Sequence, residues 1–202
     1  MTGSASILRK PLNTVIAGIL CAVFMIGSLA MMIQSRASIL RNGAEIILKT
    51  EPIDPRDLMR GDYVRLQFDE ISRPDRALFS GEWPQQDRYA PMWLTLSVGE
   101  DRAATVTAIS LEKPLNAGEG TVLLKSEPVM LSADAGDQIS QGQFALKFGI
   151  ERYYVPEGEG LEIESARNAG RTTAAIRVSK AGAAQIARLM IDGETLYQEP
   201  LY

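Results

Sequence analysis

The side chains that could do chemistry in this 202-residue chain are carboxylates, hydroxyls, lysines, arginines and tyrosines, because it contains no histidine and only one cysteine. Without histidine there is no Ser–His–Asp triad, no Cys–His dyad and no imidazole metal ligand. A single cysteine, Cys21, permits neither an intramolecular disulfide nor a thiolate zinc site. Much familiar enzyme chemistry is therefore excluded.

Carboxylates alone can support glycoside hydrolysis, which needs two of them roughly 5–9.5 Å apart. Asp62 and Glu157 are the pair to test, although nothing in the sequence fixes a pair among its 25 acidic residues. A Ser–Lys peptidase of the signal-peptidase kind needs a hydroxyl beside a buried, neutral lysine. The serines that follow the apolar N-terminal segment, Ser35 and Ser38, carry no such nucleophile motif. A carboxylate-dependent envelope hydrolase is thus the alternative function, and the peptidase is less favoured.

Four glutamates lie close together after Pro156, at positions 157, 159, 162 and 164. Carboxylate oxygens bind hard cations such as Ca²⁺, but the EF-hand spacing is absent. Acidic residues in the first turn of a short helix explain the cluster, since the helix dipole favours them there. We therefore expect no metal and no cofactor.

The most informative segment is residues 50–71, TEPIDPRDLMRGDYVRLQFDEI. Asp54 can cap a helical turn, and Pro55 fits its first position, where no N–H is needed. Asp57 would lie in the first turn, where negative charge is favourable. Gly61 can adopt the left-handed conformation that ends the turn. A well-capped connector explains most of these residues.

A strand is expected from Asp62 to Glu70, because apolar and polar side chains alternate there. The apolar face carries Val64, Leu66 and Phe68. The other face places fixed charges beside an aromatic ring, an arrangement that suits recognition. The candidate binding residues are Arg56, Arg60, Asp62, Tyr63, Arg65 and Glu157, and Glu151 and Arg152 are expected to pair with motif residues such as Arg65 or Asp62.

Residues 15–33 form an uncharged segment of nineteen residues, long enough to cross a bilayer. As a helix they would span roughly 28 Å, about the thickness of the hydrocarbon core. The run exceeds the roughly 7–15 residues of a signal-peptide core, which favours an uncleaved signal anchor. A short N-terminal tail and a long remainder suit an N-terminus in the cytoplasm. We therefore predict a tail and anchor over 1–36 and an extracytoplasmic domain over 37–202.

The predicted outer domain is acidic and rich in strand patterns. Residues 37–202 contain 18 basic and 25 acidic side chains, a net charge of −7, with no basic run. Nucleic-acid binding is therefore disfavoured. Hairpin loops are expected at 99–101, 116–120 and 192–193. Period-two alternation, typical of half-buried antiparallel strands, occurs at 46–50, 92–98, 105–109, 144–150 and 174–178. The predicted fold class is mainly β, with antiparallel strands in one or two sheets, one or two short helices, and a preceding transmembrane helix.

Residues 61–68, GDYVRLQF, resemble the octapeptide signature of the GDYXXLXY family, with Phe68 in place of its last tyrosine. Residues 52–60, 148–158 and 191–193 are similar to other stretches of that family. The resemblance implies a membrane-anchored bacterial protein of unassigned activity, whose relatives often accompany multi-spanning membrane proteins. We therefore expect a single-pass inner-membrane protein with a periplasmic domain. Its expected role is a non-catalytic binding or assembly module for a multi-spanning membrane partner or an envelope ligand.

Overall fold

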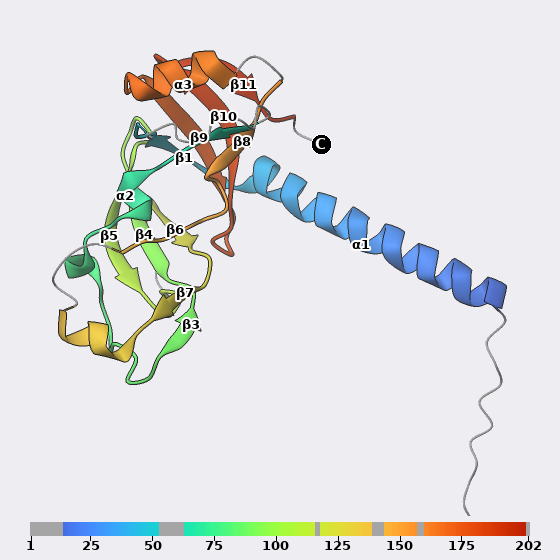
Figure 1. Ribbon diagram of the computed structural model, residues 1–202, viewed down its shortest axis with the longest axis horizontal. Coiled ribbons are helices and arrows are strands. Elements are labelled where there is room, and N and C mark those ends of the chain that lie inside the picture. The colour runs from blue at the N-terminus through green and yellow to red at the C-terminus, as the bar shows by residue number, and fades with distance from the viewer. Residues whose placement is uncertain (1–13, 53–62, 116–117, 139–143, 157–159, 201–202) are drawn as a thin grey trace, which may run out of the picture. The chain divides into compact units, whose positions relative to one another are not determined.

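The computed structural model describes residues 14–52, 63–115, 118–138, 144–156 and 160–200. One long helix is followed by short strands with short helices between them (Figure 1). The helices are α1 (Thr14–Asn42), α2 (Asp69–Ser72) and α3 (Gly160–Asn168), with 3-10 turns η1 (Arg76–Leu78) and η2 (Ala133–Gln138). The strands are β1 (Ala44–Lys49), β2 (Tyr63–Arg65), β3 (Arg88–Ala90), β4 (Trp93–Val98), β5 (Ala104–Ser110), β6 (Thr121–Lys125), β7 (Val129–Leu131), β8 (Arg152–Tyr154), β9 (Thr172–Val178), β10 (Ala184–Ile191) and β11 (Glu194–Gln198).

α1 is a 29-residue helix whose large apolar side chains from Val15 to Ile33 are exposed, whereas Ala37 and Leu40 near its end are buried. Its most apolar window has a mean hydropathy of 2.5, and none of that window is buried. Such a surface is stable in hydrocarbon rather than in water. α1 is therefore an N-terminal apolar helix of the kind that serves as a membrane anchor or a signal sequence. The chain divides into two compact units, residues 1–37 and 38–202, and the strands belong to the second.

The largest sheet has four antiparallel strands in the order β1, β9, β10, β11. β9 pairs with β1 on one side and with β10 on the other, so its backbone groups are satisfied along both edges. The turn between β10 and β11 places Asp192 and Gly193 at φ values of 53° and 84°. These left-handed values are what a two-residue hairpin loop requires, and the predicted hairpin at 192–193 is confirmed.

A three-stranded sheet has the order β5, β4, β6, and two further pairs join β2 to β8 and β3 to β7. The predicted hairpin at 99–101 is confirmed, since β4 and β5 pair antiparallel and Gly99 N–H donates to Ala103 O at 2.9 Å. The hairpin predicted at 116–120 is wrong. β6 follows β5 in sequence but pairs with the opposite edge of β4, because the first edge of β4 is already occupied.

Residues 144–150, predicted as a strand, keep the alternating burial of a strand without belonging to a sheet. Phe144 N–H donates to Pro74 O at 3.1 Å, and Leu146 N–H donates to Ser72 O at 2.8 Å. Their partners are therefore loop and helix-end carbonyls rather than a neighbouring strand. The period-two pattern predicted which side chains are buried but not which groups the backbone bonds to.

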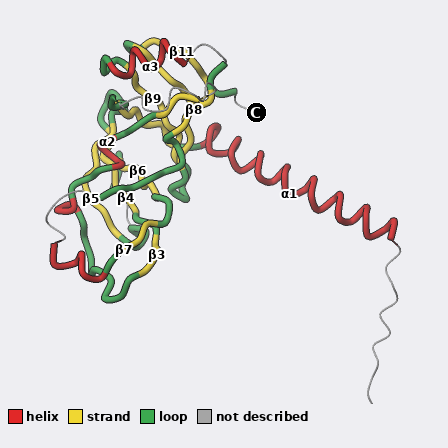
Figure 2. Tube along the Cα trace, in the orientation of Figure 1, coloured by secondary structure: helices red, strands yellow, loops and turns green. Residues whose placement is uncertain are grey.

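Buried side chains from both larger sheets and from the β2–β8 pair form one hydrophobic cluster. Strands and loops rather than helices make up most of residues 38–202 (Figure 2). The described residues thus form mostly antiparallel β structure with a few short helices, preceded by a long apolar helix, as the sequence predicted. α3 packs against β2 and β9, which places it behind the segment considered next.

Candidate binding cleft

The two sequence blocks 61–68 and 148–158 meet where β2 pairs antiparallel with β8. The register places Tyr63 opposite Tyr154, Val64 opposite Tyr153, and Arg65 opposite Arg152. Because side chains alternate across a strand, Val64 and Tyr153 enter the core, where both are buried. The other four side chains lie on the opposite face of the ribbon, so the polar face predicted for this segment exists. The strand predicted over 62–70 is wrong beyond Arg65, because β2 ends there and Asp69–Ser72 form α2 instead.

An aromatic and cationic group occupies that outer face. The rings of Tyr63 and Tyr154 lie 6.0 Å apart at an interplanar angle of 57°. The guanidinium of Arg152 lies over the Tyr63 ring, 5.5 Å from its centroid, within the range of a cation–π contact. Tyr154 is 71% exposed. The outer face of this ribbon therefore presents an aromatic surface to solvent.

A cleft of about 560 Å³ opens beside this ribbon. Four stretches line it: the end of β2, the end of α2, the loop between β6 and β7, and the extended segment that leads into β8. Its lining residues are Arg65, Leu66, Gln67, Ser72, Arg73, Glu127, Ala145, Leu146, Lys147, Gly149, Glu151 and Arg152. Leu66 N–H donates to Glu151 O at 2.9 Å, and Glu127 N–H donates to Lys147 O at 2.7 Å. Backbone hydrogen bonds thus hold the walls together.

The charges of this cleft are unequal: four of its lining side chains are cationic and two are carboxylates. Glu151 uses one carboxylate oxygen to accept a 2.6 Å hydrogen bond from Phe148 N–H. Arg73 lies 3.8 Å from Asp69 in an exposed pair. Within the part of the chain that the structure describes, no hydrogen bond or ion pair joins the side chain of Arg65 or Lys147 to a partner. The cleft therefore carries an excess of positive charge on a domain whose net charge is negative.

Arg167, in the last turn of α3, fixes the position of β2 from behind. It is 1% exposed, and one of its terminal nitrogens donates to Arg65 O at 2.6 Å. Its Nε–H also donates to Asn168 Oδ1 at 3.3 Å. Nothing in the sequence singles out Arg167, because an arginine at the end of a short helix is usually exposed.

Tyr153 anchors β8 from the core side. Burial and, next, the nearby Glu199 carboxylate raise the pKa of the Tyr153 phenol well above its usual value of 10.0. The Tyr153 ring lies 6.2 Å from that of Tyr197 on β11. β8 is therefore held between β2, whose outer face borders the cleft, and the C-terminal strand.

The structure brings together two of the candidate binding residues, since Arg65 lines the cleft wall and Tyr63 contacts Arg152, which also lines it. It also places Glu151 and Arg152 beside Arg65, although the expected ion pair between these blocks is not among the contacts of the described residues. The remaining candidates lie outside the described residues: Asp54, Pro55, Arg56, Asp57, Arg60, Gly61, Asp62 and Glu157. The Asp62–Glu157 pair is therefore still a prediction.

The Ser–Lys peptidase and the metal site considered from the sequence can be compared with the described residues. Ser35 Oγ donates to Met32 O at 2.8 Å inside α1, and the one lysine that lines the cleft, Lys147, is exposed rather than buried. Among the residues that are described, no group of three or more His, Cys, Asp or Glu side chains is arranged to hold a metal ion. Glu157 and Glu159, and the side chains of Glu162 and Glu164, lie outside the description.

Comparison with known proteins places this geometry in one family. Residues 25–189 match the family model described as GDYXXLXY protein. The match covers the C-terminal part of α1, the whole of β2 and β8, and all the residues that line the cleft. Neither the curated proteins nor the solved structures give a significant match to this chain.

Proposed function

The chain belongs to the GDYXXLXY family, and we propose that it is a membrane-anchored, non-catalytic binding module whose cleft receives an anionic segment of a membrane partner. α1 is the proposed anchor in the bacterial inner membrane, and residues 37–202 form the domain outside the cytoplasm. The proposed partner is a multi-spanning membrane protein. The observation that carries the proposal is the meeting of the two motif blocks, through β2 and β8, at one cationic cleft.

The charge distribution supports an anionic partner. Arg65 and Arg152 are direct cross-strand neighbours, and like charges in that position destabilise a strand pair. An acidic segment bound in the cleft would neutralise both guanidinium groups. The guanidinium fork also matches a carboxylate in two parallel hydrogen bonds. The repulsion in the free protein would thus become attraction in the complex.

The contacts of the cleft favour binding over catalysis. Glu151 is occupied by the Phe148 N–H, and its oxygen serves the fold of the wall. One observation favours a second candidate: Glu127 and Glu151 line the same cleft, as a carboxylate-dependent hydrolase requires. Under that alternative, Glu127→Gln and Glu151→Gln would each abolish hydrolysis of an envelope glycan. Under the binding proposal there is no hydrolysis to abolish.

Photo-crosslinking in intact membranes tests the binding proposal. A benzoylphenylalanine replaces Gln67, which lines the cleft, or Leu115, which is 99% exposed and is not among the cleft residues. We expect a crosslink from position 67 to one membrane protein, absent at position 115 and lost when Arg65 and Arg152 are both changed to Glu. The same product from both positions, or a product that survives the charge reversal, would overturn the proposal.

A further inference from the structure

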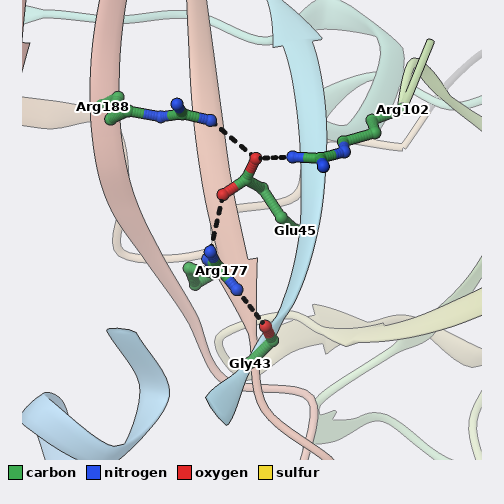
Figure 3. A network of polar contacts seen from close by, with 5 residues as sticks. All are labelled: Gly43, Glu45, Arg102, Arg177 and Arg188. Carbon is green, nitrogen blue, oxygen red and sulfur yellow. Dashed lines mark hydrogen bonds and ion pairs between the residues drawn. The ribbon is translucent and has the colours of Figure 1, made fainter. Parts of the chain in front are cut away.

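A second cluster of charges lies around Glu45, the second residue of β1 (Figure 3). Its carboxylate contacts three arginines from three different segments: Arg102 in the β4–β5 turn, Arg177 on β9 and Arg188 on β10. Arg188 and Arg177 lie 2.6 and 2.8 Å from the Glu45 oxygens. The Glu45 side chain is 8% exposed, whereas that of Arg102 is 58% exposed. One carboxylate thus gathers three guanidinium groups at the surface.

This cluster has more charge and more donors than Glu45 can satisfy. Three arginines and one glutamate leave a net charge of +2, on a domain that is net acidic. Each guanidinium carries five N–H donors. Among the described residues, Arg102 and Arg188 donate to Glu45 alone, and Arg177 donates also to Gly43 O at 2.9 Å. Most of these donors therefore have no hydrogen-bond partner among the described residues, although one of them, Arg177 Nε–H, is buried.

The backbone of Arg102 adopts a conformation that arginine rarely takes, which indicates that this position needs the guanidinium group. Arg102 has a φ of 63°, in the left-handed region where glycine or asparagine is usual. Its carbonyl accepts a hydrogen bond from Ile47 N–H at 2.8 Å, which ties this turn to β1. The strained turn thus holds the most exposed of the three guanidinium groups beside Glu45.

The cluster also lies at the end of the apolar helix. Gly43, whose carbonyl binds Arg177, is the residue that follows α1. The helix continues from Ile33, where the apolar run ends, to Asn42, a rise of about 14 Å. Arg36 and Arg41, both exposed, lie along the same stretch.

We propose that Arg102, Arg177 and Arg188 bind the phosphate group of an anionic phospholipid in the bilayer that holds α1. Guanidinium forks bind phosphate oxygens in pairs, and Glu45 holds the three forks in place before the lipid arrives. The site would fix the outer domain against the membrane surface. The inference rests on the anchoring role of α1 in the proposed function, but not on the cleft or its partner.

Native mass spectrometry of the full chain, released from nanodiscs of phosphatidylcholine with 30% phosphatidylglycerol, measures the retained anionic lipid. The test variant is Arg102→Gln/Arg188→Gln, which leaves the Arg177–Glu45 contact between β1 and β9. The control is Arg171→Gln, an exposed arginine that pairs with Asp192 at 2.7 Å. We expect retention of phosphatidylglycerol to fall at least threefold in the double variant and to be unchanged in the control.

Equal retention by the double variant and the wild type would overturn the lipid site. The lipid site would also be overturned if inorganic phosphate alone stabilised the wild type against unfolding in detergent as much as phosphatidylglycerol does. The ligand would then be free phosphate. Extraction of the chain from membranes by alkaline carbonate is measured in parallel. Release of the chain by alkaline carbonate would show that α1 is not an anchor. That outcome differs from a loss of lipid selectivity in a chain that stays in the membrane.

Discussion

Arg65 and Arg152 occupy directly opposite positions on the paired strands β2 and β8. Two guanidinium groups in that register repel one another unless an anion lies between them or one of them turns away. Arg152 is partly accommodated by the Tyr63 ring, 5.5 Å away. Arg65 has no comparable contact among the described residues. Two like charges therefore lie on one face of the ribbon, at the wall of a cleft.

This relationship predicts that Arg65→Gln does not destabilise the free domain. Removing one of two facing positive charges should raise the free energy of unfolding by about 0.5 kcal/mol, within the usual range for cross-strand pairs. Urea unfolding of the full chain in detergent micelles measures it, with Arg171→Gln as the control. A loss of more than about 1 kcal/mol would show that Arg65 makes a stabilising contact instead.

Arg167 is expected to behave in the opposite way. Arg167→Met removes a buried donor from Arg65 O, and leaves that carbonyl without its 2.6 Å partner. The expected loss of unfolding free energy is about 3 kcal/mol, since the group is charged and buried. Hydrogen exchange should show faster exchange at the β2 and β8 amides in particular. Unchanged protection of these strands would mean that α3 does not hold β2 in place.

The raised pKa of Tyr153 predicts that the domain loses stability at alkaline pH. Its pKa is raised in the folded protein, by burial first and then by Glu199, so folding favours the neutral phenol. This contribution is fully present below the unfolded pKa of about 10 and is lost as the pH rises above it. Tyr153→Phe should therefore flatten the dependence of the urea midpoint on pH between about 9 and 11. An exposed tyrosine, Tyr89, provides the control Tyr89→Phe. Parallel curves for wild type and Tyr153→Phe would contradict the assignment.

Glu45 is predicted to stabilise the domain by neutralising its three arginines. Glu45→Gln leaves their mutual repulsion uncompensated, and we expect a loss of roughly 2 kcal/mol, below the range for fully buried pairs because the arginines are partly exposed. Asp69→Asn, which breaks the exposed Arg73–Asp69 contact, should cost almost nothing. Both are measured by thermal unfolding in phosphatidylcholine nanodiscs. Equal melting temperatures for the two variants would show that the Glu45 network adds nothing.

The sequence predicted those features that depend on local pattern. Alternation at 92–98 and 174–178 predicted β4 and β9, and the Asp-Gly pair at 192–193 predicted the hairpin, because side-chain period and turn chemistry are local properties. Strand order is not local, and the loop at 116–120 was misassigned because β6 takes the far edge of β4.

The candidate site was predicted only in part, for a similar reason. The spacing within 62–70 identified Tyr63 and Arg65 as outward-facing, but nothing in the chain indicated that Glu127, Lys147 and Arg73 would line the same cleft. These residues come from separate loops whose approach depends on the tertiary fold. Arg167 was missed because an arginine at a helix end is ordinarily a surface residue, and its burial becomes evident only when α3 packs on β2.

The central claim is that the cationic cleft binds an acidic segment of a membrane partner, and charge reversal tests it most directly. The crosslink at position 67 identifies the partner. Affinity purification then measures how much of that partner is captured by the wild type, by Arg65→Glu/Arg152→Glu and by the control Arg171→Glu. We predict at least a tenfold loss of partner for the cleft variant, a full yield for the control, and weaker wild-type capture as salt rises from 0.1 to 0.5 M, since screening acts on exposed charges. Undiminished capture by a folded Arg65→Glu/Arg152→Glu variant would contradict the account.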